Sequence, residues 1–467
     1  MFNYTASYTD YYQLTMAETY FLKGQVDNTA VFDYFFRKLP FDSGYVIFAG
    51  LEDLINALEI FQFDKNDLVF LKEQGLNPEF IKYLSKFSFR GSIYSSTEGD
   101  LIFPTRPILQ VEANIIEAQI IETILLNILN FQSLIATKAS RMRQAAEGRK
   151  LIDFGLRRAQ GPGGYYASRA SFIGGFDSTS NVRASRDYGI PISGTMAHSY
   201  IESYDDELTA FIHFTEVHPE NCALVVDTYD TLKSGLPNAI RAAKIMEERG
   251  HRLNAIRLDS GDLAYLAKRS REMLDSAGLN YVKIAASNQL DEFIIKSLLD
   301  QQAPIDIFGV GTNLVTGYPD AALDGVYKLS VSGGKPRIKL SENVGKITLP
   351  HRKQVFRILD DEGNFIGADA ITLSDEPEVE LMHHPLYPLK SLSVKNNAKE
   401  LLLHKIVENG KRVNMPLSLS EIAEYSRERL KKLPAEFKRF SYPHIYKVGI
   451  SDKLRNERDK LIGEYKM

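Results

Sequence analysis

Three polar residues and one glycine lie at or just beyond the ends of short apolar runs, and their spacing is regular. Asp227, Asp259, Ser287 and Gly311 follow the runs CALVV, LNAIRL, YVKIAA and IDIF in turn. Asp259 lies 32 residues after Asp227, Ser287 lies 28 residues after Asp259, and Gly311 lies 24 residues after Ser287. Each interval is about the length of one strand plus one helix. Parallel α/β proteins bind ligands at the carboxyl ends of their strands, so we expect these residues to meet in one site. In the alternative, each of them merely caps the helix that follows.

Arg257 and Asp259 are two residues apart at the end of one of these runs. Residues two apart in a strand share a face, so a guanidinium and a carboxylate would lie side by side. Arginine suits bidentate capture of a carboxylate or phosphate, and aspartate suits a sugar diol or Mg²⁺. The pair therefore indicates an anionic, sugar-bearing ligand, unless the two side chains only satisfy each other.

The segment FGLRR joins an aromatic residue to two cations. Phe154 could stack on an aromatic ligand while Arg157 holds an anion; alternatively, Phe154 is a core residue beside surface arginines. The turn GVGT at 309–312 follows a strand and could offer backbone N–H groups to a phosphate. The chain has no GxxxxGK[ST] loop, so a Walker-type nucleotide site is not supported.

His198 lies in the stretch SGTMAHSY, directly behind a predicted short strand and turn at 191–194. That position would place it among the same strand ends, where a nucleophile or proton carrier is useful. A structural histidine is the alternative. A zinc site needs two to four convergent ligands, and His213 and His218 are five residues apart, so they do not share a helix face.

From about residue 150, apolar runs alternate with amphipathic helices. This alternation predicts βαβ units and parallel strands. We expect strands at 151–154, 222–227, 253–258, 281–286 and 305–308, and helices at 237–249, 262–277 and 290–300.

Outside this region the pattern is mixed. A helix is predicted at 78–86, with Asn77 as its N-cap and Pro78 at its first position. A second is predicted at 417–433, opening at a serine cap with Glu421 as the capping-box partner. We also expect strands at 29–37 and 87–94, a long helix at 115–148 and a hairpin at 328–340.

The composition is that of a globular protein with a large core: 467 residues, 44% hydrophobic and 25% charged. A net charge of -4 does not favour a nucleic-acid partner. The single cysteine, Cys222, excludes an intrachain disulfide and fits a reducing cytoplasm. The N-terminus does not read as a signal peptide, and the apolar segment 115–135 carries too many polar residues to favour a membrane span.

Eight motifs occur together and in order over residues 7–357. They are TDYYQLTM, FDYFFRKLPF, FGLRRAQGP, GGFDSTSN, GTMAHSY, VDTYD, RLDSGDL and FGVGTN. As a set they resemble the nicotinate phosphoribosyltransferase family. The resemblance implies a type II phosphoribosyltransferase fold of class α/β: an irregular α/β barrel and a second α/β domain built from the N- and C-terminal segments. We expect an N-terminal segment at 1–110, the barrel at 111–330 and a C-terminal segment at 331–467.

The resemblance also implies a reaction. Nicotinate and 5-phosphoribosyl 1-diphosphate would give nicotinate mononucleotide and diphosphate for NAD biosynthesis, with ATP hydrolysed through an autophosphorylated histidine, His198. The enzyme would be a cytoplasmic homodimer, with its active site at the subunit interface and without nucleic-acid or membrane partners. Mg²⁺ would be the metal and ATP a co-substrate.

Site residues carried over from the family fall into two groups. Nicotinate would lie between Phe154 and Tyr12 of the neighbouring subunit, with its carboxylate held by Arg257 and Thr195 and with Arg157 nearby. The ribose, the diphosphate and its Mg²⁺ would be served by Asp227 and Asp259. The 5-phosphate would be cradled by Ser287, Asn288, Gly311 and Thr312.

Four other functions compete with this one. A nicotinamide phosphoribosyltransferase would need a carboxylate near the ring to accept the amide N–H, and the segment 165–172 has none, which favours nicotinate. A quinolinate enzyme would need more cationic residues. A catalytically silent phospho-ligand sensor is disfavoured by the retained His198, Arg257, Asp227 and Asp259. A metal-dependent barrel hydrolase is disfavoured by the histidine spacing.

Overall fold

The computed structural model describes residues 4–387 and 389–466, and the chain forms two compact units. One unit combines the chain up to Leu134 with the chain from Ala322 onward, and the other is the middle portion, Ile135–Ala321. The sequence placed the divisions at 110 and 330. The first division instead falls inside a helix, α6 (Glu122–Ala145), which runs on from the first unit into the second.

The middle unit is built on six parallel strands in the order β7-β6-β11-β10-β9-β8. Because all six run the same way, their carboxyl ends share one edge. Among the described residues no pairing joins β7 to β8, so the ring of strands stays open there and the barrel is irregular. The strands are β6 (Lys150–Asp153), β7 (Ser178–Thr179), β8 (Ala223–Val225), β9 (Ala255–Leu258), β10 (Lys283–Ser287) and β11 (Ile307–Val310).

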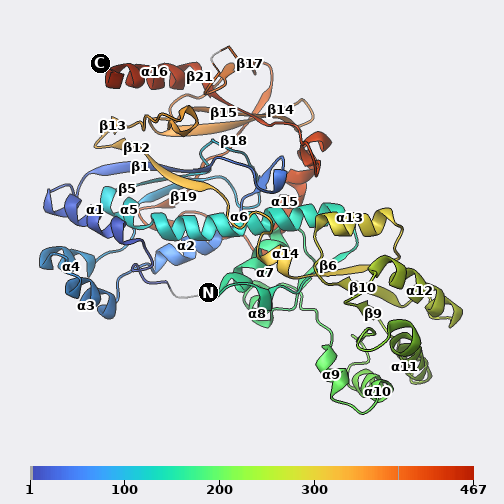
Figure 1. Ribbon diagram of the computed structural model, residues 1–467. Helices are drawn as coiled ribbons and strands as arrows, with labels where there is room; N and C mark the ends of the chain where they lie inside the picture. Colours follow the sequence, from blue (N-terminus) through green and yellow to red (C-terminus); the bar gives the residue numbers. More distant parts are fainter. Residues whose placement is uncertain (1–3, 388, 467) are drawn as a thin grey trace. The chain divides into compact units, whose positions relative to one another are not determined.

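Helices connect these strands and cover their outer side. Figure 1 shows α11, α12 and α13, in green to yellow, beside β9 and β10. The predicted helices are confirmed within two residues at each end. This unit contains α7 (Gly163–Ile173), α8 (Val182–Tyr188), α9 (His198–Glu202), α10 (Glu207–Val217), the π-helix η3 (Thr231–Gly235), α11 (Leu236–Glu248), α12 (Leu263–Ser276), α13 (Glu292–Asp300) and α14 (Thr312–Val315).

The other unit contains a seven-stranded antiparallel sheet, ordered β13-β12-β1-β5-β3-β19-β20. The predicted hairpin forms β12 and β13, which turn at Gly333 and Gly334, both with positive φ. The strands are β1 (Thr29–Phe36), β3 (Ser92–Ser95), β5 (Leu109–Asn114), β12 (Gly325–Ser332), β13 (Lys335–Pro336), β19 (His404–Glu408) and β20 (Lys411–Arg412). Both chain ends therefore contribute to one sheet.

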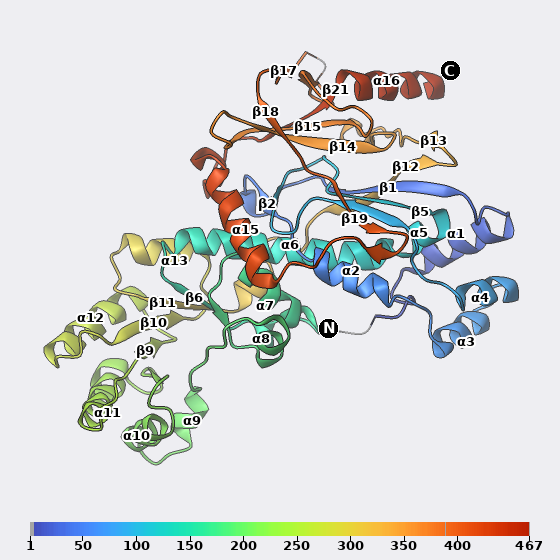
Figure 2. The same ribbon diagram turned by 180° about the vertical axis from the view of Figure 1, so that it is seen from behind.

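A second, six-stranded sheet of this unit comes from the C-terminal segment and has the order β17-β16-β21-β15-β14-β18. Figures 1 and 2 show it between α16 and the seven-stranded sheet. Its strands are β14 (Lys353–Leu359), β15 (Phe365–Leu373), β16 (Leu381–His383), β17 (Ser391–Ser393), β18 (Ala398–Leu401) and β21 (Lys447–Ser451). A separate two-stranded ribbon joins β2 (Val46–Ile47) to β4 (Leu101–Ile102).

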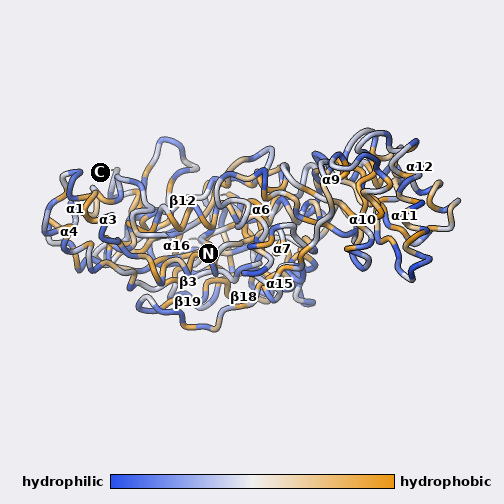
Figure 3. The backbone as a smooth tube through the Cα atoms, turned by 90° about the horizontal axis from the view of Figure 1, so that it is seen from below, coloured by the Kyte–Doolittle hydropathy of each residue, from blue (hydrophilic) through white to orange (hydrophobic). Residues whose placement is uncertain are grey.

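The helices of this unit pack their apolar faces onto the sheets. A large core joins β1 and β5 to α2, α5 and the first part of α6. Hydrophobic and hydrophilic residues interleave along the tube in Figure 3, as amphipathic elements require. The helices are α1 (Tyr11–Leu22), α2 (Leu51–Glu59), α3 (Lys65–Glu73), α4 (Pro78–Leu84), α5 (Ile115–Ile120), α15 (Leu419–Lys432) and α16 (Asp452–Lys466).

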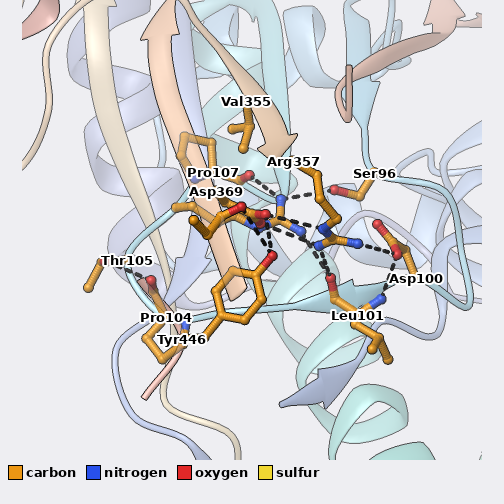
Figure 4. A network of polar contacts seen from close by, with 12 residues as sticks. Ser96, Asp100, Leu101, Pro104, Thr105, Pro107, Val355, Arg357, Asp369 and Tyr446 are labelled. Carbon is orange, nitrogen blue, oxygen red and sulfur yellow. Dashed lines mark hydrogen bonds and ion pairs between the residues drawn. The ribbon is translucent and has the colours of Figure 1, made fainter. Parts of the chain in front are cut away.

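A buried ionic network links the two chain ends within this unit (Figure 4). Asp100, from the N-terminal segment, accepts hydrogen bonds at 2.7 Å from Arg357 and Arg429 of the C-terminal segment. Asp369 lies 2.9 Å from Arg106 and 3.1 Å from Arg357. Three guanidiniums therefore share two carboxylates in the interior, which ties β14 and α15 to the loop between β3 and β5.

Two predicted elements differ from the structure. The helix expected at 115–148 is two helices, α5 and α6, which are separated at Ile121, the C-cap residue of α5. The strand expected at 87–94 starts only at Ser92. Phe87 and Phe89 point into the core instead, and a side chain on Gly91 would come within 2.5 Å of Ala113.

Both predicted helix caps are present. Asn77 accepts a hydrogen bond from the backbone of Glu79, and Ser418 forms a capping box with Glu421. The α/β class, with a barrel-like parallel unit and a second unit built from both chain ends, is confirmed. None of the helices within residues 4–387 and 389–466 is long and apolar enough to span a membrane.

Candidate active site

A cavity of about 820 Å³ opens at the carboxyl ends of the parallel strands. Its walls are the loops after β6, β7, β9, β10 and β11, together with the segment that leads into α9. Ten of the twelve residues predicted for the site line it, all except Asp227 and Tyr12: Phe154, Arg157, Thr195, His198, Arg257, Asp259, Ser287, Asn288, Gly311 and Thr312. Three of the four regularly spaced residues, Asp259, Ser287 and Gly311, thus line one cavity.

Arg257 is the most connected side chain of the cavity. Its Nε donates to Ser287 Oγ at 2.9 Å and its Nη1 to Thr195 Oγ1 at 3.1 Å. Its Nη2 lies 2.9 Å from Asp259 Oδ1. The predicted Arg–Asp pair therefore forms, and the same guanidinium also connects the loops after β7 and β10. Such a fork is a preorganised anion-binding group.

Asp227 and Asp259 do not cap helices. The helices after β8, β9 and β10 are capped by other aspartates, namely Asp230, Asp262 and Asp291. Asp227 Oδ2 instead accepts from the backbone N–H of Asp259 at 2.8 Å and from the Ser260 hydroxyl at 2.6 Å. Asp259 Oδ1 accepts from the Ser287 hydroxyl. The capping alternative is wrong for these two residues, which remain available for chemistry.

His198 begins α9 and faces both carboxylates. Its Nδ1 lies 3.1 Å from the Thr228 hydroxyl. Its Nε2 lies 3.6 Å from Asp259 Oδ2 and 4.0 Å from Asp227 Oδ1. Of the short strand and turn expected ahead of it, the strand is present only as a parallel bridge between Ile192 and Thr179, and residues 193–197 form no turn. The histidine is therefore part of the cavity rather than of a hydrophobic core.

The Phe154 ring forms an aromatic wall beside Arg257. The Arg257 guanidinium carbon lies 5.4 Å from the centre of the ring. The ring also rests on Gly309 of β11, where an added Cβ would come within 2.3 Å of it. An aromatic surface with a cation beside it suits a flat ligand that carries a negative charge.

The loop after β10 has an unusual backbone. Asn288 and Gln289, which both line the cavity, have φ of 88° and 47°, a region that non-glycine residues rarely adopt. Asn313 holds this loop by donating to the carbonyl of Gln289 at 2.9 Å. Strained backbone of this kind clusters at ligand-binding sites. Next to it, Thr312 begins α14, and the first N–H groups of a helix lack intrahelical partners.

The carboxylates also fit a divalent cation bound together with phosphates. Asp227 Oδ1 is buried and has no hydrogen-bond partner among the described residues, and Asp259 Oδ2 faces the same space. In the described part of the chain, no group of three or more His, Cys, Asp or Glu could hold a metal ion. Mg²⁺ typically uses one or two carboxylates and completes its shell with water and phosphate oxygens, so two carboxylates suffice.

Asp259 is held in its charged form. Burial alone would raise the pKa of this carboxyl, but the Ser287 hydrogen bond and the Arg257 charge outweigh burial and keep the pKa below its ordinary value. It is also the only carboxylate among the described residues that line the cavity, beside Arg157, Arg158 and Arg257. The cavity therefore favours anionic ligands.

Tyr12 lies outside this cavity, on α1 of the other unit, and is 51% exposed. Its expected place is the active site of a neighbouring subunit, and that role stays a prediction.

The cavity contains residues that sequence reasoning missed. Val182 and Ile192 are 69% and 60% exposed at its wall, and Ser180 and Met196 line it as well. Ser180 belongs to the motif GGFDSTSN, which had no assigned role. The segment 165–172, expected to approach the ring, is part of helix α7, and none of its residues lines the cavity. Because this buried helix does not line the cavity, the absence of carboxylates in segment 165–172 does not discriminate between nicotinate and nicotinamide as substrate.

Comparison with known proteins agrees with the geometry. Family models described as nicotinate phosphoribosyltransferase match at residues 8–130 (N-terminal domain), 149–362 (family) and 352–458 (C-terminal domain). The nicotinate phosphoribosyltransferase of Bacillus subtilis is 45% identical, with 98% of this chain and 95% of that protein covered. A nicotinate phosphoribosyltransferase of Mycobacterium tuberculosis, pncB2, is 41% identical, with 98% and 94% covered.

Solved structures agree as well. The crystal structure of human nicotinic acid phosphoribosyltransferase superposes with a TM-score of 0.88 at 31% identity, and covers 97% of this chain and 99% of that one. Sequence similarity and fold are shared along almost the entire length of the chain. The chain belongs to the nicotinate phosphoribosyltransferase family of enzymes.

Proposed function

We propose that the chain joins nicotinate to 5-phosphoribosyl 1-diphosphate, which gives nicotinate mononucleotide and diphosphate in NAD biosynthesis. The observation that carries this assignment is the aromatic wall of Phe154 with the Arg257–Thr195 pair beside it. A pyridine ring fits the wall, and its carboxylate fits the guanidinium and the hydroxyl. The relatives' names agree with this substrate.

The reaction requires the pyridine nitrogen to displace diphosphate from the anomeric carbon of the ribose. The new bond is N–C, the broken bond is C–O, and the electron pair leaves with the diphosphate. Positive charge develops on the sugar in such a displacement, as it does in glycoside cleavage. Phe154 and Arg257 would hold the ring in line, which is the positioning that makes displacement fast.

The second substrate would lie along the loops after β8 to β11. Ser287, Asn288, Gly311 and Thr312 line the end of the cavity where a 5-phosphate would bind. Asp227 and Asp259 would hold Mg²⁺ through the oxygens that face His198. Bound Mg²⁺ would neutralise charge on the diphosphate that leaves.

The proposed reaction is coupled to ATP hydrolysis through His198. A ring nitrogen of His198 would attack the γ-phosphorus of ATP and release ADP, and water would later cleave the phosphohistidine to inorganic phosphate. A phosphoryl group adds negative charge and acceptor oxygens. Beside Asp227 and Asp259 it would change the electrostatics at the diphosphate end of the cavity and so link ATP use to substrate affinity.

The enzyme is further proposed to be a cytoplasmic homodimer. Support comes from two exposed apolar regions that a second copy could cover: Tyr11 and Tyr12 on α1, and Val182 and Ile192 at the cavity wall. A cytoplasmic location is supported by the single cysteine, Cys222, which is buried and unpaired.

Product analysis tests the function directly. The chain is incubated with phosphoribosyl diphosphate and Mg²⁺ and with nicotinate, nicotinamide or quinolinate, each with and without ATP. Nicotinate mononucleotide should form fastest, and ATP should accelerate it with release of ADP. Preference for nicotinamide or quinolinate would overturn the substrate assignment, and binding without any product would favour the sensor alternative.

The role of His198 is tested by His198→Ala, with His251→Ala as a control at a half-buried histidine that pairs with Glu220 outside the cavity. The His198 variant should keep slow ATP-independent transfer and lose stimulation by ATP. The His251 variant should behave as wild type. Stimulation that persists in His198→Ala would show that the phosphohistidine assignment is wrong.

A further inference from the structure

Asp153 ends β6 as a buried carboxylate without a cationic partner. The residue is 1% exposed, and no lysine, arginine or histidine of the described chain pairs with it. Burial raises its pKa, while hydrogen bonds from Ser168, Thr179 and Gly155 act in the opposite direction. Burying a charge is unfavourable, so its presence beneath the cavity requires a structural reason.

Three donors converge on this carboxylate. Its Oδ2 accepts from the Ser168 hydroxyl and from the Thr179 hydroxyl, both at 2.7 Å. Its Oδ1 accepts from the backbone N–H of Gly155 at 2.8 Å. A carboxylate only accepts, so it satisfies all three; an asparagine would place an amide donor against at least one of them.

These bonds connect two walls of the cavity. On one side, Asp153 precedes Phe154 and fixes the backbone of Gly155, which has to be glycine because a Cβ there would meet Val315 at 2.0 Å. On the other side, the carbonyl of Asp153 accepts from the N–H of Ser180 at 2.9 Å.

Thr179 extends the connection to the second wall. Its hydroxyl donates to Asp153 and also accepts from the backbone N–H of Asn181 at 3.0 Å. Asn181 in turn caps α8, whose first residue is Val182. The Phe154 wall and the Ser180–Val182 wall are therefore both held by one buried carboxylate.

We propose that Asp153 is a positioning residue that fixes Phe154 relative to the Ser180–Val182 wall and so shapes the slot in which the pyridine ring would stack on Phe154, and that it thereby sets the affinity for the ring. This inference rests on the proposed function, since it takes nicotinate as the occupant of the slot. It assigns no contact between Asp153 and substrate. Phosphoribosyl diphosphate, which would bind toward Asp259 and Ser287, should be insensitive to the slot.

The test is steady-state kinetics of Asp153→Asn with each substrate varied in turn. The KM for nicotinate should rise about tenfold or more, because small displacements of a positioning group have large effects, while the KM for phosphoribosyl diphosphate stays within about twofold. Thr179→Val keeps the shape of the side chain and removes only the hydroxyl. It should also raise the KM for nicotinate more than the KM for phosphoribosyl diphosphate, but by a smaller factor. If Asp153→Asn does not fold, Thr179→Val decides alone.

Asp177→Asn is the matched control. Asp177 lies at the opposite end of the same strand pair, where its carboxylate accepts from the backbone of Leu151 at 2.7 Å and pairs with Arg143. Asp177→Asn should lower the melting temperature, but it should not raise the KM for nicotinate relative to the KM for phosphoribosyl diphosphate. Equal changes of both KM values in Asp153→Asn, or an unchanged nicotinate KM in Thr179→Val, would overturn the proposal.

The two proposals fail in different ways. If the wild-type chain forms no nicotinate mononucleotide, the proposed function is wrong, whatever the variants do. If the wild type is active and the variants do not raise the KM for nicotinate more than the KM for phosphoribosyl diphosphate, only the role of Asp153 is wrong.

Discussion

Phe154 rests on Gly309, and this contact leaves no room for a side chain at residue 309. An added Cβ would lie 2.3 Å from one ring carbon and 2.5 Å from another. Gly309 lies in β11 and pairs with Ile152 of β6, the strand that leads to Phe154. The ring can therefore lie across a bare strand end. This bare end determines how far Phe154 projects into the cavity.

Gly309→Ala should push the Phe154 ring into the cavity. We expect the KM for nicotinate to rise about tenfold, since displacement of a positioning group by about 1 Å can cost far more. Gly194→Ala is the control, because Gly194 lines the same cavity but a Cβ there would meet nothing within 4 Å. Steady-state kinetics measures both. A nicotinate KM that is equal in the two variants would contradict the packing argument.

Arg257→Lys should be far from conservative. Lysine keeps the charge, but a single ammonium cannot reproduce the fork that contacts Ser287, Thr195 and Asp259 together. We expect kcat/KM for nicotinate to fall about 100-fold, which corresponds to about 2.7 kcal/mol of transition-state stabilisation.

Arg158→Lys is the control for this substitution, because Arg158 lines the cavity and is exposed. It should change kcat/KM by less than about threefold, as expected for an exposed charge. Comparable losses in the two variants would mean that charge alone, rather than the fork of Arg257, holds the ligand.

Ser287→Ala should shift the acid limb of the pH profile upward. The Ser287 hydrogen bond helps to keep the pKa of Asp259 below its ordinary value, so its removal raises that pKa. Activity that needs the charged carboxylate is then lost at a higher pH than in the wild type. The profile of kcat/KM for phosphoribosyl diphosphate reports this ionisation in the free enzyme.

Ser276→Ala is the matched hydroxyl deletion, since the Ser276 hydroxyl donates to the carbonyl of Glu272 in α12 and contacts neither carboxylate of the site. Its acid limb should stay in place. A limb that moves equally in both variants would indicate a general change in the cavity instead of the predicted effect on Asp259.

Much of the middle unit could be predicted because its signals are local. Apolar runs that end in polar residues predicted where the strands lie. Because parallel strands all run in the same direction, Asp259, Ser287 and Gly311 were then expected at one edge of the sheet. The role of the aspartates as caps could not be decided in advance. Asp227 and Asp230 are equally good caps by residue type, and only the fold assigns the cap to Asp230.

Other features depend on tertiary packing and leave no local pattern. The positive φ of Asn288 occurs in a loop that Asn313, 25 residues later in the chain, holds by a side-chain hydrogen bond. Val182 and Ile192 resemble core residues by type, yet they are exposed at the cavity wall. The segment 165–172 was misplaced because a buried helix of small and aromatic residues has no clear polar face to distinguish it from a loop near the ligand.

The buried network of the first unit leads to a prediction about stability. Asp100 accepts from Arg357 and Arg429, so Asp100→Asn would leave buried guanidiniums short of a counter-charge. Breaking a buried ion pair from one side typically costs about 3–5 kcal/mol, and we expect a loss of this size in the free energy of unfolding at neutral pH. Glu380→Gln, which breaks an exposed pair with Lys395, should cost less than about 1 kcal/mol.

The same network predicts how this loss depends on pH. Burial would raise the pKa of Asp100, but Arg357 and Arg429 outweigh it and hold the pKa below its ordinary value. A lowered pKa in the folded state adds stability that is complete above the unfolded pKa of about 3.9 and fades as the pH falls toward the folded pKa. Denaturant titrations should therefore show that the free energy of unfolding of Asp100→Asn lies below that of the wild type by a constant amount from neutral pH down to about 5. Below about pH 4 this difference should become smaller. A difference that widens on acidification would show that the carboxylate is not stabilised by these arginines.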